Sequence, residues 1–477
     1  MHDMAHRTRR NARRSLALLT GIVALFALLT VTLSAPASVE AQQAAPTFTP
    51  ADPLTQAFYM VRDALEERHS TDLSLVTRWE FAESEFPNTI TSCVDLGEDE
   101  QAINLYWGWR FVIVSLSNQT YEGRASFDRS IIIACDRVEA PVSQPTAAPN
   151  VDPNLPAPVA GSGATGSFEL GGHVLELNGN TVGLMRRAGM HWVKYQLRYT
   201  LGQDPSTAAN LIAGARANGF KILLGIVGSP SELGASFDSY IQSYAQFVAG
   251  VARLGADAIE VWNEPNIDRE WPAGQINGAN YTRLLAAAFN AIKSTGASTI
   301  VISGAPAPTG YFGSAGCGSG GCNDDTFMQQ MAQAGAASYM DCVGLHYNEG
   351  IIAPSQNSGD PRGGYPTYYF SSMTARGYNP FSRPVCYTEL GYLSPEGFQS
   401  PLPGSFAWAQ NTSVSEHASW LAEAASLAAQ SGRVRLMIVW NVDFPFYTAT
   451  DPMGGYAMSR PDGTCPACDA LGRVMGS

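Results

Sequence analysis

The sequence predicts an α/β protein, a (β/α)8 TIM barrel preceded by a small α+β module and a proline-rich linker. Short apolar segments alternate with helical segments between residues 162 and 477, which is typical of such a barrel. Six prolines between Pro141 and Pro158 predict a semi-stiff linker at residues 139–161. Hydrophobic residues make up 45% of the chain and charged residues only 15%, which supports a large buried core.

The N-terminal segment, residues 1–41, predicts export from the cytoplasm. Five arginines precede an apolar run at residues 15–33, and small residues follow it, with Ala41 ending one candidate cleavage site. The run is near the length that spans a bilayer, so the segment is either a cleaved signal peptide or a retained signal anchor. We expect a secreted or extracytoplasmic protein, which an uncleaved N-terminus would attach to a membrane or the cell envelope.

The charge pattern excludes several classes of partner. The net charge is −13 at pH 7, and an acidic body repels nucleic acid phosphates and anionic lipid head groups. We therefore expect no nucleic acid partner. The seven histidines form no His-x-His or His-Glu-x-x-His pattern, which argues against a metal-dependent hydrolase. We expect neither a metal nor an organic cofactor.

Eight cysteines fit an oxidising compartment. Proximity along the chain suggests three disulfides, Cys93 with Cys135, Cys317 with Cys322, and Cys465 with Cys468. Cys342 and Cys386 then remain, and they either pair or stay as buried thiols. The last close pair could instead be half of a zinc site or a redox pair, but no second pair with ligand spacing accompanies it.

Residues 42–138 predict a small α+β module whose role the sequence does not assign. A segment with helical spacing is followed by three strand-like segments, at residues 102–107, 110–114 and 130–133. Trp107 and Trp109 could form a face for stacking sugars. We favour packing in a small core for both, because tryptophan is usually buried.

The large domain, residues 162–477, is where the barrel is predicted. Its strand-like segments are residues 168–173, 192–198, 221–227, 258–263, 299–303, 342–346, 385–389 and 437–441. Its helical segments include residues 181–188, 206–217, 237–254, 281–294, 326–334 and 413–430. An open doubly wound sheet would also alternate. The count of eight strands, and the lack of a glycine-rich phosphate turn after the first one, favour a barrel.

Two glutamates stand where predicted strands end. Glu264 closes the fourth strand, where Pro265 cannot donate to a neighbouring strand, and Glu389 closes the seventh. The carboxyl ends of barrel strands meet on one face, so we expect the two side chains to lie close together. Two carboxyl groups ~5–5.5 Å apart can cleave a glycosidic bond with retention of configuration, whereas ~6.5–9.5 Å predicts inversion.

This arrangement resembles clan A of the glycoside hydrolases, and most of all the loose group around families 5 and 39. The resemblance rests on the Asn-Glu-Pro after strand four, the glutamate after strand seven and a tryptophan on strand eight. It covers residues 162–477 and none of the N-terminal module. It implies an O-glycosyl hydrolase that acts on a carbohydrate by retaining double displacement. Glu264 would be the general acid and then the general base, and Glu389 the nucleophile.

The resemblance also implies residues that bind substrate. Asn263 would hydrogen-bond the sugar 2-hydroxyl, and His346 would line the site. Tyr347 would match the clan tyrosine that orients the nucleophile, in a His-Tyr pair where the clan has His-x-Tyr. Arg198 would match an arginine that holds the nucleophile ionised. Trp440 would lie under the sugar ring that is cleaved.

Alternatives remain at the level of the sequence. Glu349 and Glu396, in the loops after strands six and seven, are rivals of the proposed nucleophile. Trp271 lies just beyond the proposed acid, and we expect it to contact substrate through its ring. An inactive barrel that binds or senses envelope carbohydrate is one alternative function, and a transglycosylase that uses the same two glutamates is another.

Overall fold

We describe the protein from a computed structural model. The structure describes residues 53–87, 93, 105–139, 155–159, 167–310, 312 and 316–476, so the predicted signal segment and most of the linker lie outside it. Thr47–Ser477 group into one compact unit. Within the described ranges, no helix has both the length and the apolar character needed to cross a membrane.

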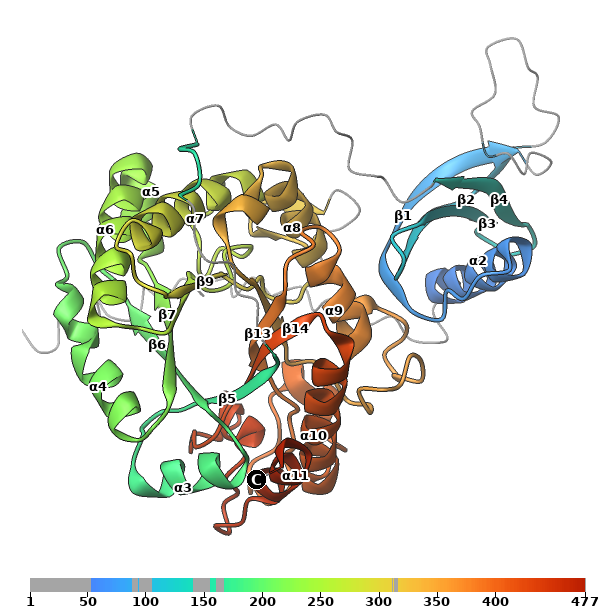
Figure 1. Ribbon diagram of the computed structural model, residues 1–477. Coiled ribbons are helices and arrows are strands. Elements are labelled where there is room, and N and C mark those ends of the chain that lie inside the picture. Colours follow the sequence, from blue (N-terminus) through green and yellow to red (C-terminus); the bar gives the residue numbers. More distant parts are fainter. Residues whose placement is uncertain are drawn as a thin grey trace, which may run out of the picture. The chain divides into compact units, whose positions relative to one another are not determined.

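The large domain is built on an eight-stranded parallel sheet (Figure 1). Its strands follow the order β12-β13-β14-β5-β6-β7-β8-β9. A parallel bridge between Ile302 and Cys342 joins β9 to the residue before β12 and brings the two edges together. The strands are β5 (Glu169–His173), β6 (Trp192–Arg198), β7 (Lys221–Val227), β8 (Ala258–Val261), β9 (Ile300–Ser303), β12 (Val343–Tyr347), β13 (Val385–Leu390) and β14 (Val434–Val439). The predicted (β/α)8 barrel is confirmed.

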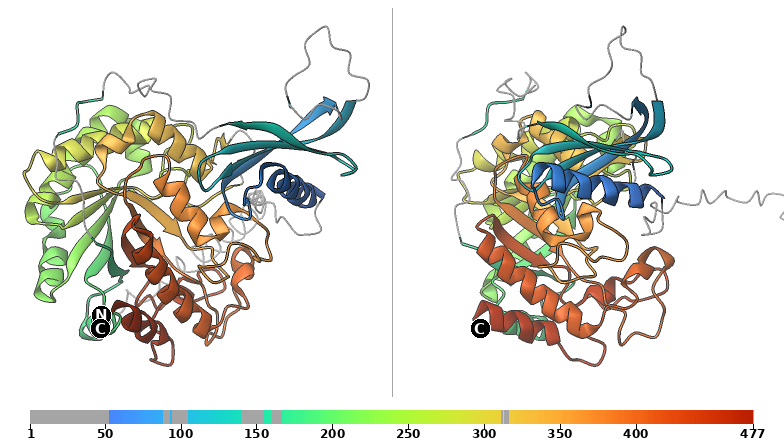
Figure 2. Two further views of the ribbon diagram at one scale, coloured as in Figure 1. Left: turned by 45° about the vertical axis from the view of Figure 1, so that its right-hand side comes forward. Right: turned by 90° about the vertical axis from the view of Figure 1, so that its right-hand side faces the viewer.

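Helices surround the strands on the outside (Figures 1 and 2). They are α3 (Gly179–Arg187), α4 (Ala209–Ala217), α5 (Pro230–Ala235), α6 (Phe237–Leu254), α7 (Gly278–Lys293), α8 (Asp324–Gln333), α9 (Phe370–Tyr378), α10 (Val414–Ser431) and α11 (Pro466–Met475). The 3-10 helices are η1 (Pro205–Ala208), η2 (Ala336–Tyr339), η3 (Pro366–Tyr368), η4 (Gly404–Ala409) and η5 (Met453–Tyr456), and a small hairpin joins β10 (Cys317–Gly318) to β11 (Gly321–Cys322).

Local sequence explains where the longer helices begin and end. Ser413 and Glu416 form a reciprocal capping box at the start of α10, which satisfies two backbone N–H groups that have no helical partner. Gly432 ends the same helix at φ 63°, and Gly255 ends α6 at φ 95°. Both glycines adopt the left-handed conformation that costs other residues energy, so each of these helices stops where the next strand must start.

Apolar side chains fill the interior of the barrel near the amino ends of the strands. Polar side chains fill the next layer toward the carboxyl ends. The filling layer consists of Trp192, Leu223, Ala258, Ile302, Cys342, Cys386, Leu436 and Ile438. Side chains two residues further along a strand point the same way, so Lys194, Glu260 and Thr388 form the next inward layer. The chemistry of this barrel is thereby confined to the carboxyl ends of its strands.

All eight cysteines form disulfides. The three pairs suggested by proximity are confirmed: Cys93–Cys135, Cys317–Cys322 and Cys465–Cys468. The fourth disulfide joins Cys342 to Cys386 and thus ties the beginnings of neighbouring strands β12 and β13 together. This settles the choice between a disulfide and two buried thiols.

We expect the Cys342–Cys386 disulfide to be a major source of stability. It closes a loop with a sequence separation of 44 residues. Replacing both cysteines with alanine should lower the free energy of unfolding by about 4 kcal/mol, because the unfolded chain regains the entropy of that loop. The equally buried pair Cys465 and Cys468, separated by 3 residues, is a matched control and should cost only roughly 1.5 kcal/mol. Guanidinium unfolding curves measure both losses, and equal losses would contradict this account.

The N-terminal residues form a separate antiparallel sheet covered by a helix. Helix α2 (Pro53–His69) packs on β1 (Val76–Pro87), β2 (Leu105–Ser115), β3 (Thr120–Ser126) and β4 (Ile132–Glu139), which are adjacent in that order. The sequence prediction included the helix, divided β2 into two segments and placed the start of β4, but it missed β1 and β3. Trp109 packs edge-on against Phe127, as expected of a core residue, whereas Trp107 is 61% exposed, so its predicted burial is wrong.

Candidate active site

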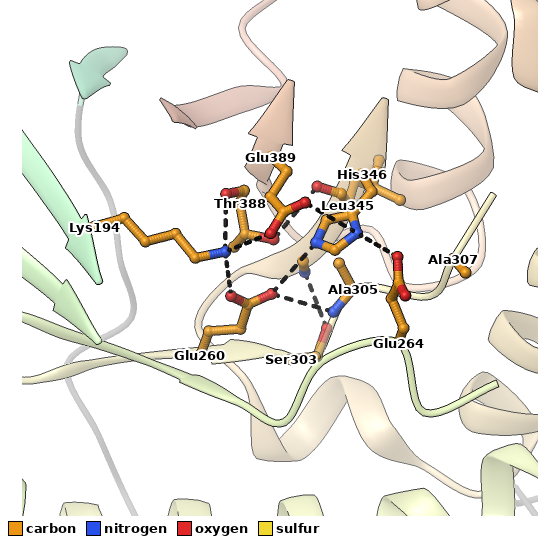
Figure 3. Close-up of polar contacts among 12 residues, drawn as sticks. Lys194, Glu260, Glu264, Ser303, Ala305, Ala307, Leu345, His346, Thr388 and Glu389 are labelled. Carbon is orange, nitrogen blue, oxygen red and sulfur yellow. Dashed lines mark hydrogen bonds and ion pairs between the residues drawn. The ribbon is translucent and has the colours of Figure 1, made fainter. Parts of the chain in front are cut away.

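The two predicted catalytic glutamates meet at the carboxyl ends of the barrel strands (Figure 3). His346, on β12, lies between them. Its Nδ1 is 3.4 Å from Oε1 of Glu264 and 3.8 Å from Oε2 of Glu389. These two oxygens cannot be further apart than the sum of the two distances, roughly 7 Å, a bound that admits the spacing of a retaining pair and reaches only the short end of the inverting range.

The backbone around Glu264 turns sharply to bring the carboxyl inward. Trp262 has φ 77° and Glu264 has φ 43°, a left-handed conformation that is costly for residues other than glycine. Two hydrogen bonds hold the turn: the Trp262 indole donates to the carbonyl of Glu270 at 2.7 Å, and the backbone N–H of Glu264 donates to the carbonyl of Ala305 at 2.9 Å. The alternation of inward and outward side chains along the strand is broken at this turn, so the carboxyl group of Glu264 points into the site.

An irregular strand register turns the side chain of Glu389 inward. By alternation, Cys386 and Thr388 point into the barrel, and Glu389 would point out toward the helices. The pairing of β13 shifts between Leu345 and His346 on one side and between Tyr387 and Leu390 on the other. Such bulges reorient side chains near active sites, and here Glu389 lies 7% exposed beside His346.

A buried lysine provides the cation for Glu389. Nζ of Lys194 lies 2.9 Å from Glu260 and 3.4 Å from Glu389, and it donates a further hydrogen bond to the carbonyl of Thr388 at 3.1 Å. Lys194 and Glu260 are each 1% exposed. A side chain at Gly225 would lie within 3.2 Å of Glu260, so glycine there leaves room for this ion pair.

The pKa directions follow from this cluster of charges. Burial alone would lower the pKa of Lys194, but the charges of Glu260 and Glu389 raise it above the ordinary value. Burial also disfavours the cation of His346, yet the neighbouring carboxylates raise its pKa. For Glu264, burial favours the neutral acid, but the hydrogen bond and charge of His346 and the charge of Arg269 together lower its pKa. These contacts therefore favour the ionised form of Glu264.

Three of the predicted binding residues lie elsewhere than the resemblance implied. Arg198 pairs with Glu270 through two hydrogen bonds of 2.8 and 3.1 Å, so its expected contact with Glu389 is wrong and Lys194 occupies that place. Tyr347 points away from the site, and its hydroxyl donates to the carbonyl of Tyr368, because adjacent strand residues face opposite sides.

The third correction concerns Trp271. Its ring is completely buried between Trp262 and Tyr281, and its indole N–H donates to the carbonyl of Gln275. It packs behind the turn and cannot contact a sugar. The residue that takes the position expected for Tyr347 is Asn348, whose amide donates to Oε2 of Glu389 at 3.5 Å.

Asn263 and Trp440 are the remaining predicted binding residues. Asn263 is 8% exposed, and its Oδ1 has no hydrogen-bond partner, so an acceptor is left for a ligand hydroxyl. Trp440, which follows β14, is half-buried and packs edge-on against His173 and Phe444. The indole is thus held between His173, at the end of the first barrel strand, and Phe444, in the loop after the last one.

The rival carboxylates have other partners. Glu349 accepts a hydrogen bond from the hydroxyl of Thr367, and Glu396 accepts one from the backbone N–H of Val414.

A cavity of about 560 Å³ lies between α6 and α7 on the outside of the barrel. It is remote from the carboxylate pair, and we assign it no catalytic role.

Possible metal ligands were also compared. Within the described ranges, one group of three side chains brings its ligand atoms close enough to share an ion: Cys93, Glu122 and Cys135. Both sulfurs of this group are in a disulfide. At the barrel site, Lys194, Arg269 and His346 supply positive charge to the carboxylates themselves.

Comparison with known proteins bears on the fold. No family model and no curated protein matches the sequence. Solved structures do match. A family 39 glycoside hydrolase from the gut symbiont Bacteroides cellulosilyticus is 17% identical, with a TM-score of 0.45 over 78% of this chain and 70% of that one.

Two further solved structures are similar. A fungal β-1,4-galactanase is 12% identical, with a TM-score of 0.45 over 65% of this chain and 94% of that one. A GH5-4 broad specificity endoglucanase from Bacteroides salanitronis is 14% identical, with a TM-score of 0.40 over 66% and 96%. At these identities the likeness concerns the fold alone.

Proposed function

We propose that this chain is an exported glycoside hydrolase that cleaves O-glycosidic bonds of a poly- or oligosaccharide with retention of configuration. The observation that supports the proposal is the approach of Glu264 and Glu389 to the same nitrogen of His346. Two carboxylates that both contact one side chain are close enough to act on opposite sides of one anomeric carbon.

In the first step Glu389 attacks the anomeric carbon. An ester bond forms between that carbon and the carboxylate, the bond to the leaving oxygen breaks, and Glu264 gives its proton to that oxygen. In the second step Glu264 takes a proton from water, which attacks the same carbon and releases Glu389. Asn263 offers its unpaired Oδ1 to the sugar 2-hydroxyl, and the half-buried ring of Trp440 offers an apolar face.

The surroundings of Glu389 suit a nucleophile. Its carboxylate lies 3.4 Å from Nζ of Lys194 and accepts a hydrogen bond from Asn348, so both contacts hold it in place beside His346. Lys194 is a positioning residue in this scheme, because it reaches the sugar only through Glu389. No cofactor takes part in either step.

The stereochemistry of the product tests the proposal. Aryl β-glucosides, β-xylosides, β-mannosides and β-galactosides, their α-anomers, and a set of plant polysaccharides would be screened first. NMR of the first product formed from any hydrolysed substrate should show the anomer of the substrate. Release of the opposite anomer would contradict a retaining pair, and no turnover of any substrate by wild type would favour a carbohydrate-binding role instead.

Replacing Glu264 with alanine should produce a loss that depends on the leaving group. We expect kcat/KM to fall by about 10²–10⁴-fold for glycosides whose leaving group is a sugar or an alcohol, because these need protonation. The 2,4-dinitrophenyl glycoside of the same sugar is the internal control and should retain most of its kcat/KM, since its leaving group needs no acid. Equal losses on both substrates would show that Glu264 is not the acid.

We also propose export through residues 1–41 and attachment of residues 42–138 to the barrel by the linker at 139–161. The four disulfides are compatible with a location outside the cytoplasm. Sequencing the N-terminus of the mature protein separates the two forms of export. A start near residue 42 indicates a cleaved signal peptide, whereas an intact N-terminus in the membrane fraction indicates a retained anchor.

A further inference from the structure

Arg269 forms an ion pair with Glu264 through the carboxylate oxygen that does not contact His346. Oε1 of Glu264 contacts Nδ1 of His346 at 3.4 Å, while Oε2 accepts a hydrogen bond from the guanidinium of Arg269. The side chain of Arg269 is 69% exposed and that of Glu264 only 14%. Arg269 therefore covers the carboxylate from outside, and it comes from the same loop, five residues along the chain.

This contact opposes the reaction proposed above, on which the present inference rests. A general acid must carry a proton and must reach the leaving oxygen with the same carboxyl group. A guanidinium ion on that carboxyl favours its ionised form and occupies one of its oxygens. Arg269 must accordingly leave Glu264 before the bond to the leaving group breaks.

A second exposed arginine stands on the same side of the site. Arg198, at the end of β6, is 58% exposed and binds Glu270 through two hydrogen bonds. Glu270 follows Arg269 directly in the chain, and its negative charge contributes to raising the pKa of Arg269. Arg269, in the loop after β8, and Arg198, which pairs with Glu270 of that loop, thus both expose a guanidinium group, in a protein whose net charge is −13.

The chemistry of guanidinium groups limits what could displace this contact. Hydroxyl groups of a neutral sugar are weaker acceptors than a carboxylate, so they leave Arg269 on Glu264. Another carboxylate or a sulfate matches the planar fork of arginine and competes on equal terms. We propose that Arg269 recognises an anionic group on the sugar that leaves, and that binding of such an acidic glycan frees Glu264 to donate its proton.

The other charged groups around Glu264 cannot take the place of an anionic ligand that draws Arg269 away from Glu264. His346 approaches from β12 and holds the inner oxygen, while Glu260 and Glu389 act on the acid through that histidine. None of these side chains faces solvent as Arg269 does. Arg269 is therefore the one cation of the cluster, within the described residues, that a substrate can meet at the surface.

Matched aryl glycosides test the proposal. For a sugar that the protein hydrolyses, the 3-carboxyphenyl and 3-sulfophenyl glycosides would be compared with the neutral 3-carbamoylphenyl glycoside. We expect kcat/KM of wild type to be at least about tenfold higher for the charged leaving groups. Arg269→Gln should abolish this preference. Arg187→Gln, which removes an exposed arginine paired with Asp469 on a distant helix, is the control and should keep it.

The pH profile provides a readout that a structural role of Arg269 would not move. Removing a positive charge from the neighbourhood of Glu264 raises the pKa of that carboxyl. The alkaline limb of kcat/KM on the neutral glycoside should therefore shift to higher pH in Arg269→Gln, and turnover of that substrate should increase. Circular dichroism confirms that the variant is folded.

The outcomes separate this proposal from the proposed function. Hydrolysis of charged and neutral glycosides at equal rates, or a preference that survives in Arg269→Gln, overturns the anionic recognition and leaves the glycosidase intact. If wild type hydrolyses none of them, calorimetric titration with oligogalacturonate and with neutral galactan oligosaccharides decides. Binding of the acidic oligomer alone that is lost in Arg269→Gln supports the recognition, and its absence overturns it.

Discussion

Replacing Glu389 with alanine should lower kcat by at least about 10⁴-fold on every substrate that the protein hydrolyses, because the covalent intermediate can no longer form. This loss should hold for activated and unactivated leaving groups alike, unlike that of Glu264→Ala. The neighbouring hydrogen bond from Asn348 and the ion pair with Lys194 lose their acceptor, but the fold should remain, since the side chain lies at the open end of the barrel.

Glu396→Ala is the matched control for that experiment. Glu396 lies in the loop that follows β13, and its carboxylate accepts a backbone hydrogen bond from Val414. Its replacement should leave kcat within a few-fold of wild type. A comparable loss in both variants would mean that the loop conformation, and not the nucleophile, had been damaged.

The second large effect is expected at Lys194. Lys194→Met leaves Glu260 and Glu389 buried without their shared cation, which should lower the free energy of unfolding by about 3–5 kcal/mol. It should also abolish most of the activity, because Glu389, the proposed nucleophile, loses the ion pair that positions its carboxylate. The double change Lys194→Met with Glu260→Leu should recover part of the stability, since it replaces a buried pair by apolar side chains.

Lys293→Met is the control that separates the loss of stability from the loss of activity. Lys293 forms a buried ion pair with Asp341 at 2.6 Å, with both side chains at most 5% exposed, but it belongs to α7 and lies outside the catalytic cluster. It should lose a similar amount of stability in a urea unfolding curve while keeping kcat near wild type. Full activity in Lys194→Met, measured at a temperature where it is folded, would contradict the role of Lys194 as positioning residue.

Much of the fold could be predicted from the sequence because the barrel strands are short, apolar and bounded by clear breaks. The predicted bounds of β6, β7 and α6 agree with the structure at every residue. The strands β1 and β3 were missed. Polar and aromatic residues alternate in β1 only from Arg78 to Phe81, and β3 has two charged residues and a glycine among its seven, so neither contains the apolar run that marked the predicted strands.

The candidate site was only partly predictable. Glu264, Glu389 and His346 follow from position, since each falls at the carboxyl end of a strand. The choice between Lys194 and Arg198 does not, because both point inward and only the stagger of the strands decides which of them is level with Glu389. Period-two alternation does indicate that His346 and Tyr347 face opposite sides, and it favours Asn348 as the inward neighbour of His346.

Trp271 is buried because of the left-handed backbone conformation of Trp262, which no sequence pattern predicted. The left-handed conformation of Trp262 turns its own ring back among the helices, and Trp271 packs edge-on against it at 5.1 Å. A tryptophan in a loop near an active site therefore became part of the core. The contact of Arg269 with Glu264 depends on the same turn, and it was likewise missing from the sequence analysis.

Azide rescue of Glu389→Ala tests the assignment of the two carboxylates most directly. Sodium azide is small enough to enter the space left by the glutamate, and it needs no proton to attack the anomeric carbon. With a 2,4-dinitrophenyl glycoside, the account predicts restored turnover and a glycosyl azide of inverted configuration. Rescue of Glu264→Ala but not of Glu389→Ala, or an azide of that configuration from neither variant, would contradict it.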